Sequence, residues 1–161
     1  MAAALLDPDR IAMVAKGVSA IVASCSAAGL PSLMRAVGSH ISPDGQCVTV
    51  FLRRSQSAQL LQDIADTGQI AVVFSEPATH RTLQIKARQA LQRPATGEDL
   101  PLLQAYLRSM QHEVGQVGFG PQYVAAMLAA PLDDVVAVSF TPGAAFDQTP
   151  GPRAGATLPA P

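Results

Sequence analysis

The 161-residue chain is long enough for one domain with its own core, and 48% of its residues are hydrophobic while only 14% are charged. This composition excludes a largely disordered chain. The net charge of −1 excludes a general nucleic-acid binder, which needs an excess of Lys and Arg to neutralise phosphates.

The N-terminal segment predicts one short helix and no membrane contact. Its apolar run, residues 1–6, ends at Asp7 and is too short for a membrane span or the core of a signal peptide. We therefore expect a cytoplasmic protein. Asp7 before Pro8 is typical of a helix start, and the helix should end near Lys16, before Gly17.

Three antiparallel strands are predicted next. Apolar and small residues alternate over residues 18–27, and a second strand is predicted over residues 32–41. The sequence Ser-Pro-Asp-Gly at residues 42–45 favours a hairpin turn, and a third strand follows over residues 46–52.

The middle of the chain predicts a helix followed by two strands. Residues 55–66 have a helical stripe of leucine and isoleucine, with Ser55 or Ser57 as the N-cap. A buried strand is predicted over residues 70–74, and one long strand over residues 81–92.

The last third predicts two helices and a strand. Thr96 and Asp99 resemble a capping box. The helix that follows should have a core face made by Leu100, Leu103, Tyr106, Leu107 and Met110. A second helix is predicted over residues 121–130 and a strand over residues 135–140.

The order of these elements predicts a mainly β fold with helices, of the α+β class. We expect an antiparallel split β-barrel with peripheral helices, because no parallel strand–helix–strand rhythm appears. Residues 1–143 should form the barrel domain, and residues 144–161 a Pro- and Gly-rich extended tail.

The sequence contains no classical catalytic or metal-binding motif, so the catalytic residues are unknown and no metal is expected. Its three histidines lie far apart in the sequence. Arg35, Arg53 and Arg54 are predicted on strands or strand ends, next to serines at a helix start. Guanidinium groups, hydroxyls and free amides there predict an anion site. A solvated loop with exposed arginines is the alternative.

Several segments together resemble the FMN-binding split-barrel proteins related to pyridoxamine 5′-phosphate oxidase. The resemblance covers about residues 8–140 and is carried by residues 35–40, 48–52, Ser57, 70–74 and 81–87. It implies a homodimer with FMN in clefts built by both subunits. It also implies a cofactor site made by Arg35, Ala36, Val37, His40, Phe51, Leu52, Ser57, Gln59, Thr82 and Gln84.

The departures from the family pattern shape the expected activity. Ala58 and Gln59 follow Ser57 where family members often have a lysine, and the chain has no Trp for the substrate segment of the oxidase proper. The resemblance therefore implies an FMN-dependent oxidoreductase that acts on an unknown small molecule. The alternatives are a deazaflavin cofactor, a cofactor-free dimer that acts as a binding or structural module, and a haem-binding relative. Against the last, no histidine follows His112.

Overall fold

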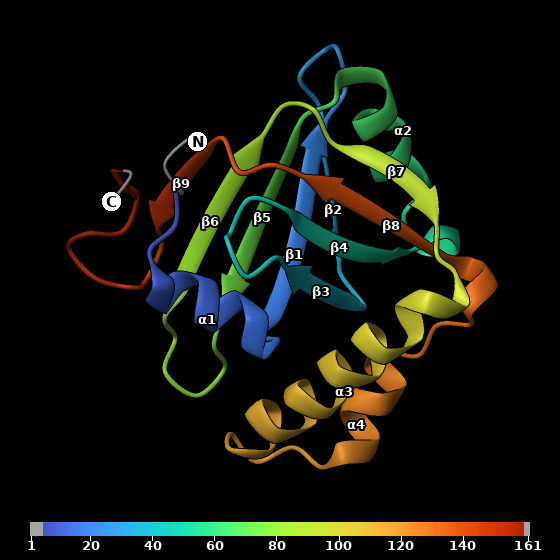
Figure 1. The fold of residues 1–161 in the computed structure, drawn as a ribbon, viewed down its shortest axis with the longest axis vertical. Helices are drawn as coiled ribbons and strands as arrows, with labels where there is room; N and C mark the ends of the chain where they lie inside the picture. The colour runs from blue at the N-terminus through green and yellow to red at the C-terminus, as the bar shows by residue number, and fades with distance from the viewer. Residues whose placement is uncertain (1–4, 160–161) are drawn as a thin grey trace.

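The computed structural model describes residues 5–159, which form two antiparallel sheets around a shared core, with helices at the rim (Figure 1). Residues 1–4 of the N-terminal apolar run and residues 160–161 of the tail lie outside the described part. No helix among residues 5–159 is long and apolar enough to cross a membrane.

The larger sheet has six strands in the order β10-β9-β6-β5-β1-β2. Their bounds are β1 Ser19–Cys25, β2 Pro31–Arg35, β5 Ile70–Ser75, β6 Thr82–Ala87, β9 Ala144–Asp147 and β10 Ala156–Thr157. The smaller sheet has the order β3-β4-β8-β7. Its bounds are β3 Gly38–Ile41, β4 Val48–Arg53, β7 Leu91–Pro94 and β8 Val135–Phe140. The predicted α+β split-barrel class is confirmed.

Four α-helices lie around the sheets: α1 Pro8–Lys16, α2 Ala58–Thr67, α3 Leu100–Gly115 and α4 Pro121–Met127. Helix α1 begins as predicted, because the Asp7 carboxylate accepts a hydrogen bond from the Arg10 amide. The predicted capping box before α3 is also confirmed, since Thr96 N donates to Asp99 Oδ2 at 2.8 Å. Figure 1 shows α3 and α4 packed together below the smaller sheet.

Two predicted strands are each divided between the two sheets. The strand predicted over residues 32–41 ends at Arg35, after which Ala36 N bonds to Ala20 O in one sheet and Val37 N bonds to Phe51 O in the other. The strand predicted over residues 81–92 likewise divides into β6 and β7. The chain crosses from sheet to sheet at these points while its apolar pattern continues, so alternation alone missed both breaks.

The main core fills the space between the inner faces of the sheets. Val22, Val72 and Ile85 face it from the larger sheet, and Val50 and Val138 from the smaller one. All five are fully buried. Helix α2 adds Leu60, Leu61 and Ile64 to this core, as its predicted stripe required.

Helix α3 covers part of the outer face of the smaller sheet. The Tyr106 hydroxyl donates to Val18 O at 2.8 Å, and burial raises the pKa of this hydroxyl far above its usual range. Gly38 lies directly beneath the helix, because a Cβ there would be only 2.7 Å from Leu103 Cδ2. Leu100 is 41% exposed, so its predicted place in the core face is wrong.

The C-terminal segment continues the larger sheet. Strand β9 pairs with β6 from Leu83↔Asp147 to Lys86↔Ala144, and β10 then pairs with β9. The segment predicted to be an extended tail, residues 144–161, therefore includes the outer two strands of this sheet.

Candidate functional site

The structure distributes the ten predicted site residues over three places. Arg35, Thr82 and Gln84 share the outward face of the larger sheet, according to the strand register. Ser57 and Gln59 lie at the start of α2. The other five lie in the core or on the smaller sheet: Ala36, Val37, His40, Phe51 and Leu52.

A row of polar side chains crosses the outward face of the larger sheet. Arg35 Nη1 donates to Ser19 Oγ at 2.8 Å, Ser19 is the register partner of Ser75, and Ser75 Oγ lies 2.8 Å from Thr82 Oγ1. We call Arg35, Ser19, Ser75 and Thr82 the polar strip. The polar strip runs across β2, β1, β5 and β6 and includes two predicted site residues, Arg35 and Thr82.

The rest of this outward face is apolar or neutral, apart from Lys86. Ile21, Val73 and Gln84 form the row next to the polar strip, and all three are half-buried. Asp147 is the one Asp or Glu within the six strands, and it pairs with the buried Leu83, so its position is on the inner face of the sheet. No Asp or Glu of these strands therefore points outward. No carboxylate of residues 5–159 is within ion-pair distance of Arg35. The guanidinium group is thus available to an anion.

Phe51 and Leu52 are fully buried on opposite faces of β4. Leu52 belongs to the main core, whereas Phe51 packs with Val37 against α3. Ala36 is also fully buried, and His40 is exposed on β3. Among these five residues, His40 alone presents a side chain to solvent.

The chain's own carboxylate occupies part of the predicted anion site at the start of α2. Asp134 accepts from Ser55 N at 2.9 Å, from Ser55 Oγ at 2.6 Å and from Arg53 Nε at 3.0 Å. The Ser55 hydroxyl and then Arg53 hold the pKa of Asp134 below its usual range. An incoming phosphate would have to displace Asp134 from these donors.

Ser57 and Gln59 differ in their availability at the same helix start. Ser57 Oγ is buried and has no hydrogen-bond partner within residues 5–159. Gln59 is exposed, but its amide donates to Asp63 Oδ1 at 2.8 Å. The predicted roles of both residues in phosphate binding remain predictions.

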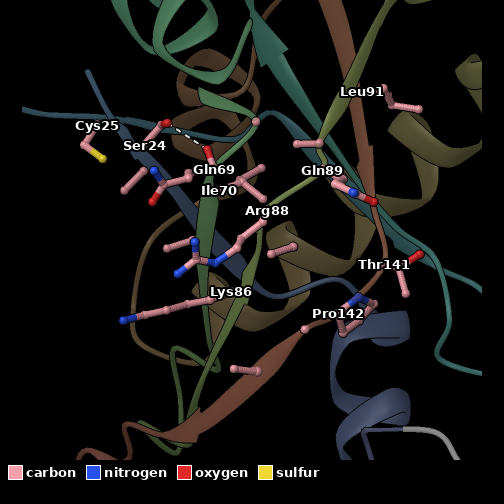
Figure 2. Close-up of a pocket in the computed structure, with 17 residues that line it drawn as sticks. Ser24, Cys25, Gln69, Ile70, Lys86, Arg88, Gln89, Leu91, Thr141 and Pro142 are labelled. Atoms are coloured by element: carbon pink, nitrogen blue, oxygen red, sulfur yellow. Dashed lines mark hydrogen bonds between the residues drawn. The ribbon is translucent and has the colours of Figure 1, made fainter. Parts of the chain in front are cut away.

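A groove of about 1300 Å³ lies at the other end of α2, where Lys86 and Arg88 are its two cations (Figure 2). We call it the cationic groove, and none of the ten predicted residues lines it. Its walls come from residues 23–25, 68–71, 86–91 and 141–144. Sequence reasoning missed it, although the Lys-Ala-Arg spacing at residues 86–88 places two cations on one side of an extended chain.

No family model matches the sequence, and no curated relative was found. Solved structures do resemble the fold. HupZ from group A Streptococcus has a TM-score of 0.55 and 13% identity, covering 93% of this chain and 99% of its own. A candidate pyridoxamine 5′-phosphate oxidase from Lactobacillus delbrueckii has a TM-score of 0.54 and 12% identity, covering 88% and 93%.

An F420 reductase gives a TM-score of 0.53 at 14% identity and covers 83% of this chain and 93% of its own. These alignments span nearly the whole of each protein, but their identities are low enough that the likeness concerns the fold alone. The chain has the split-barrel fold of the pyridoxamine 5′-phosphate oxidase-like proteins.

Proposed function

We propose that the protein binds FMN on the outward face of its larger sheet and acts as a flavin-dependent oxidoreductase. The observation that carries this proposal is the polar strip, in which three hydroxyls and a guanidinium group without a carboxylate partner in residues 5–159 lie beside a half-buried apolar surface. The names of two similar structures, a candidate pyridoxamine 5′-phosphate oxidase and an F420 reductase, add support from proteins of the same fold.

The residues of this face fit a phosphorylated aromatic ring. Arg35 and the strip hydroxyls offer hydrogen bonds to a phosphate, and bonds between charged groups are the strongest of this kind. Ile21 and Val73 offer a flat apolar surface to the ring, and the Gln84 amide can both donate and accept at its edge. FMN supplies electron or hydride transfer when it is bound, while the chain's side chains bind it, orient it and exclude water.

Arg35→Ala should weaken FMN binding about 10- to 100-fold, since a hydrogen bond between charged groups contributes about 1.5–3 kcal/mol. Isothermal titration calorimetry with FMN measures this change. Arg108→Ala is the matched control, because Arg108 is an exposed arginine on α3 that has no ion-pair partner among residues 5–159. FMN affinity should be unchanged in that variant.

A third variant distinguishes phosphate binding at the polar strip from phosphate binding at the start of α2. Asp134→Asn weakens the competing carboxylate at the start of α2, so FMN affinity should rise only if the phosphate binds there. Wild-type protein that stays colourless and gives no heat with FMN would overturn the proposal. A Soret band with added haem would instead favour the haem-binding alternative.

We further propose that two copies pair across this face, with the cofactor between them. Half-buried Ile21 and Val73 leave apolar surface on the outward face of the larger sheet, and large apolar surfaces are uncommon on monomers. Light scattering should give twice the chain mass of 16.7 kDa, and a monomer mass would contradict this pairing.

A further inference from the structure

The cationic groove has the charge of an anion-binding site. Its lining includes Lys86 and Arg88 but no Asp or Glu. Neither cation has a carboxylate within ion-pair distance in the described part of the chain. Figure 2 shows both side chains extending to the same side of the chain, the side on which Cys25 and Gln69 lie.

Small side chains form the floor of the groove beside these cations. Lys86 is the register partner of Ala71, and Ala71 is the partner of Ala23 on the next strand. The exposed Leu33 then pairs with Ala23 at the edge of the sheet. With neighbouring strands about 4.8 Å apart, the floor from β6 to β1 is about 10 Å wide. A bicyclic ring or a short alkyl chain fits this width.

The backbone that carries the two cations is held from both sides. Gly143 N donates to Lys86 O at 2.9 Å, and Ala90 N donates to Gly68 O at 3.0 Å. Gly68 has φ +68°, and a Cβ there would be 2.5 Å from Arg88 O, so α2 approaches this backbone closely. Lys86 Nζ also lies 4.9 Å from the centroid of the Phe146 ring. These contacts therefore hold in place the backbone that carries Lys86 and Arg88.

We propose that the cationic groove binds a small organic anion with an apolar body. Its carboxylate, sulfonate or phosphate group would bind Lys86 and Arg88, and its body would lie over Ala71 and Ala23. Thr82 is four residues from Lys86 along β6, a separation of about 13 Å. The cations of the groove are thus apart from the polar strip, and its floor of Ala71 and Ala23 is a second site next to the row of Ile21, Val73 and Gln84 assigned to the flavin ring.

The test uses two fluorescent probes that differ in charge, 8-anilinonaphthalene-1-sulfonate and the uncharged N-phenyl-1-naphthylamine. We expect the sulfonate to bind the full-length protein. The double variant Lys86→Ala/Arg88→Ala should raise its Kd at least tenfold and leave the Kd of the uncharged probe unchanged. Ala71→Leu, which fills the floor and keeps both charges, should weaken both probes.

The double variant Arg108→Ala/Arg153→Ala is the matched control, since it removes two exposed arginines outside the groove. An equal loss of sulfonate binding in this control would overturn the proposal, as would unchanged binding in Lys86→Ala/Arg88→Ala. Thermal unfolding of each variant is followed in parallel, and sulfonate fluorescence that tracks unfolding would also count against the groove.

FMN titrations distinguish failure of this site from failure of the flavin site. Lys86→Ala/Arg88→Ala should retain the FMN affinity of the wild type, and Arg35→Ala should retain its affinity for the sulfonate probe. Competition between FMN and the sulfonate, with both lost in Lys86→Ala/Arg88→Ala, would mean that the two sites are one and would overturn the proposal of a second site.

Discussion

Phe51→Ala should lower the free energy of unfolding by about 3–5 kcal/mol, the usual cost of removing a buried aromatic ring. Phe51 is fully buried and packs with Val37 and Val135 beneath α3. Its removal leaves a cavity that Leu102 and Leu103 on the helix above can fill only in part. Urea denaturation followed by circular dichroism measures the change.

Phe119→Ala is the matched control, because Phe119 is 51% exposed and stacks on Tyr123 outside the core. It should cost no more than about 1 kcal/mol. The pair also tests the predicted contact between Phe51 and FMN. A Phe51→Ala protein of nearly wild-type stability that has lost FMN affinity would show that the ring serves the cofactor rather than the packing of α3.

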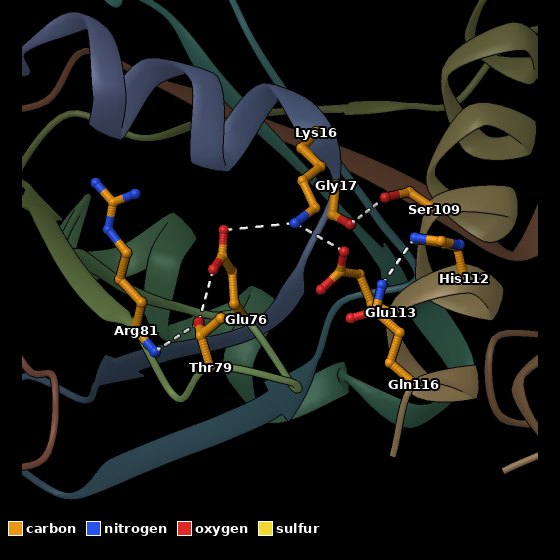
Figure 3. Close-up of polar contacts among 9 residues, drawn as sticks. All are labelled: Lys16, Gly17, Glu76, Thr79, Arg81, Ser109, His112, Glu113 and Gln116. Atoms are coloured by element: carbon orange, nitrogen blue, oxygen red, sulfur yellow. Dashed lines mark hydrogen bonds and ion pairs between the residues drawn. The ribbon is translucent and has the colours of Figure 1, made fainter. Parts of the chain in front are cut away.

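A buried carboxylate joins α1 to α3 through one lysine (Figure 3). Lys16 Nζ lies 2.7 Å from Glu113 Oε1 and 3.5 Å from Glu76 Oε1. The Glu113 side chain is 3% exposed, whereas that of Lys16 is 43% exposed. The hydrogen bond to Glu113 is the main reason why the pKa of Lys16 is raised above 10.5.

Lys16→Met should destabilise the protein by about 2–3 kcal/mol, because it leaves the buried Glu113 carboxylate without its cation. Glu113→Gln should cost less, since the half-exposed Lys16 still has Glu76 and solvent. The double variant should recover part of the loss from Lys16→Met, and a double-mutant cycle from urea denaturation measures the coupling. A double variant as unstable as the sum of the singles would contradict this pairing.

The same ion pair gives a pH dependence with a definite sign. Because the folded-state pKa of Lys16 is raised, the pair stabilises the protein below pH 10.5 and loses its effect as the pH rises through the folded pKa. The wild type should therefore lose more stability than Lys16→Met between pH 9 and the alkaline end of the titration. Equal losses of stability in the wild type and in Lys16→Met would show that a group other than Lys16 causes the alkaline loss.

Local sequence patterns predicted most of the helices and strands, but they did not predict how these elements are arranged in the two sheets. Asp7-Pro8 and the Thr96–Asp99 capping box act within one helical turn, so the sequence contains their whole physical cause. The breaks at Ala36 and at Arg88 depend on where the chain passes between two sheets, and no local residue marks them.

The candidate site was likewise predicted only in part, because some of its features depend on contacts between distant parts of the chain. The resemblance named Arg35, Thr82 and Gln84, and the strand register places all three on one face. It could not indicate that Asp134, 79 residues from Ser55, would supply a carboxylate to the start of α2. Burial of Phe51 likewise depends on α3, which begins 49 residues later in the chain at Leu100 and whose position is a tertiary property.

The pairing of β9 with β6 also constrains how the chain can be shortened. Ending it at residue 143 would strip the partner from β6 and leave a row of main-chain amides and carbonyls open along that strand. With residues 144–157 present, the outer strand at this side of the sheet is β10, whose two residues offer little length for another molecule to pair with. We therefore expect β9 and β10 to limit intermolecular sheet growth, and a chain that ends at residue 143 to aggregate more readily.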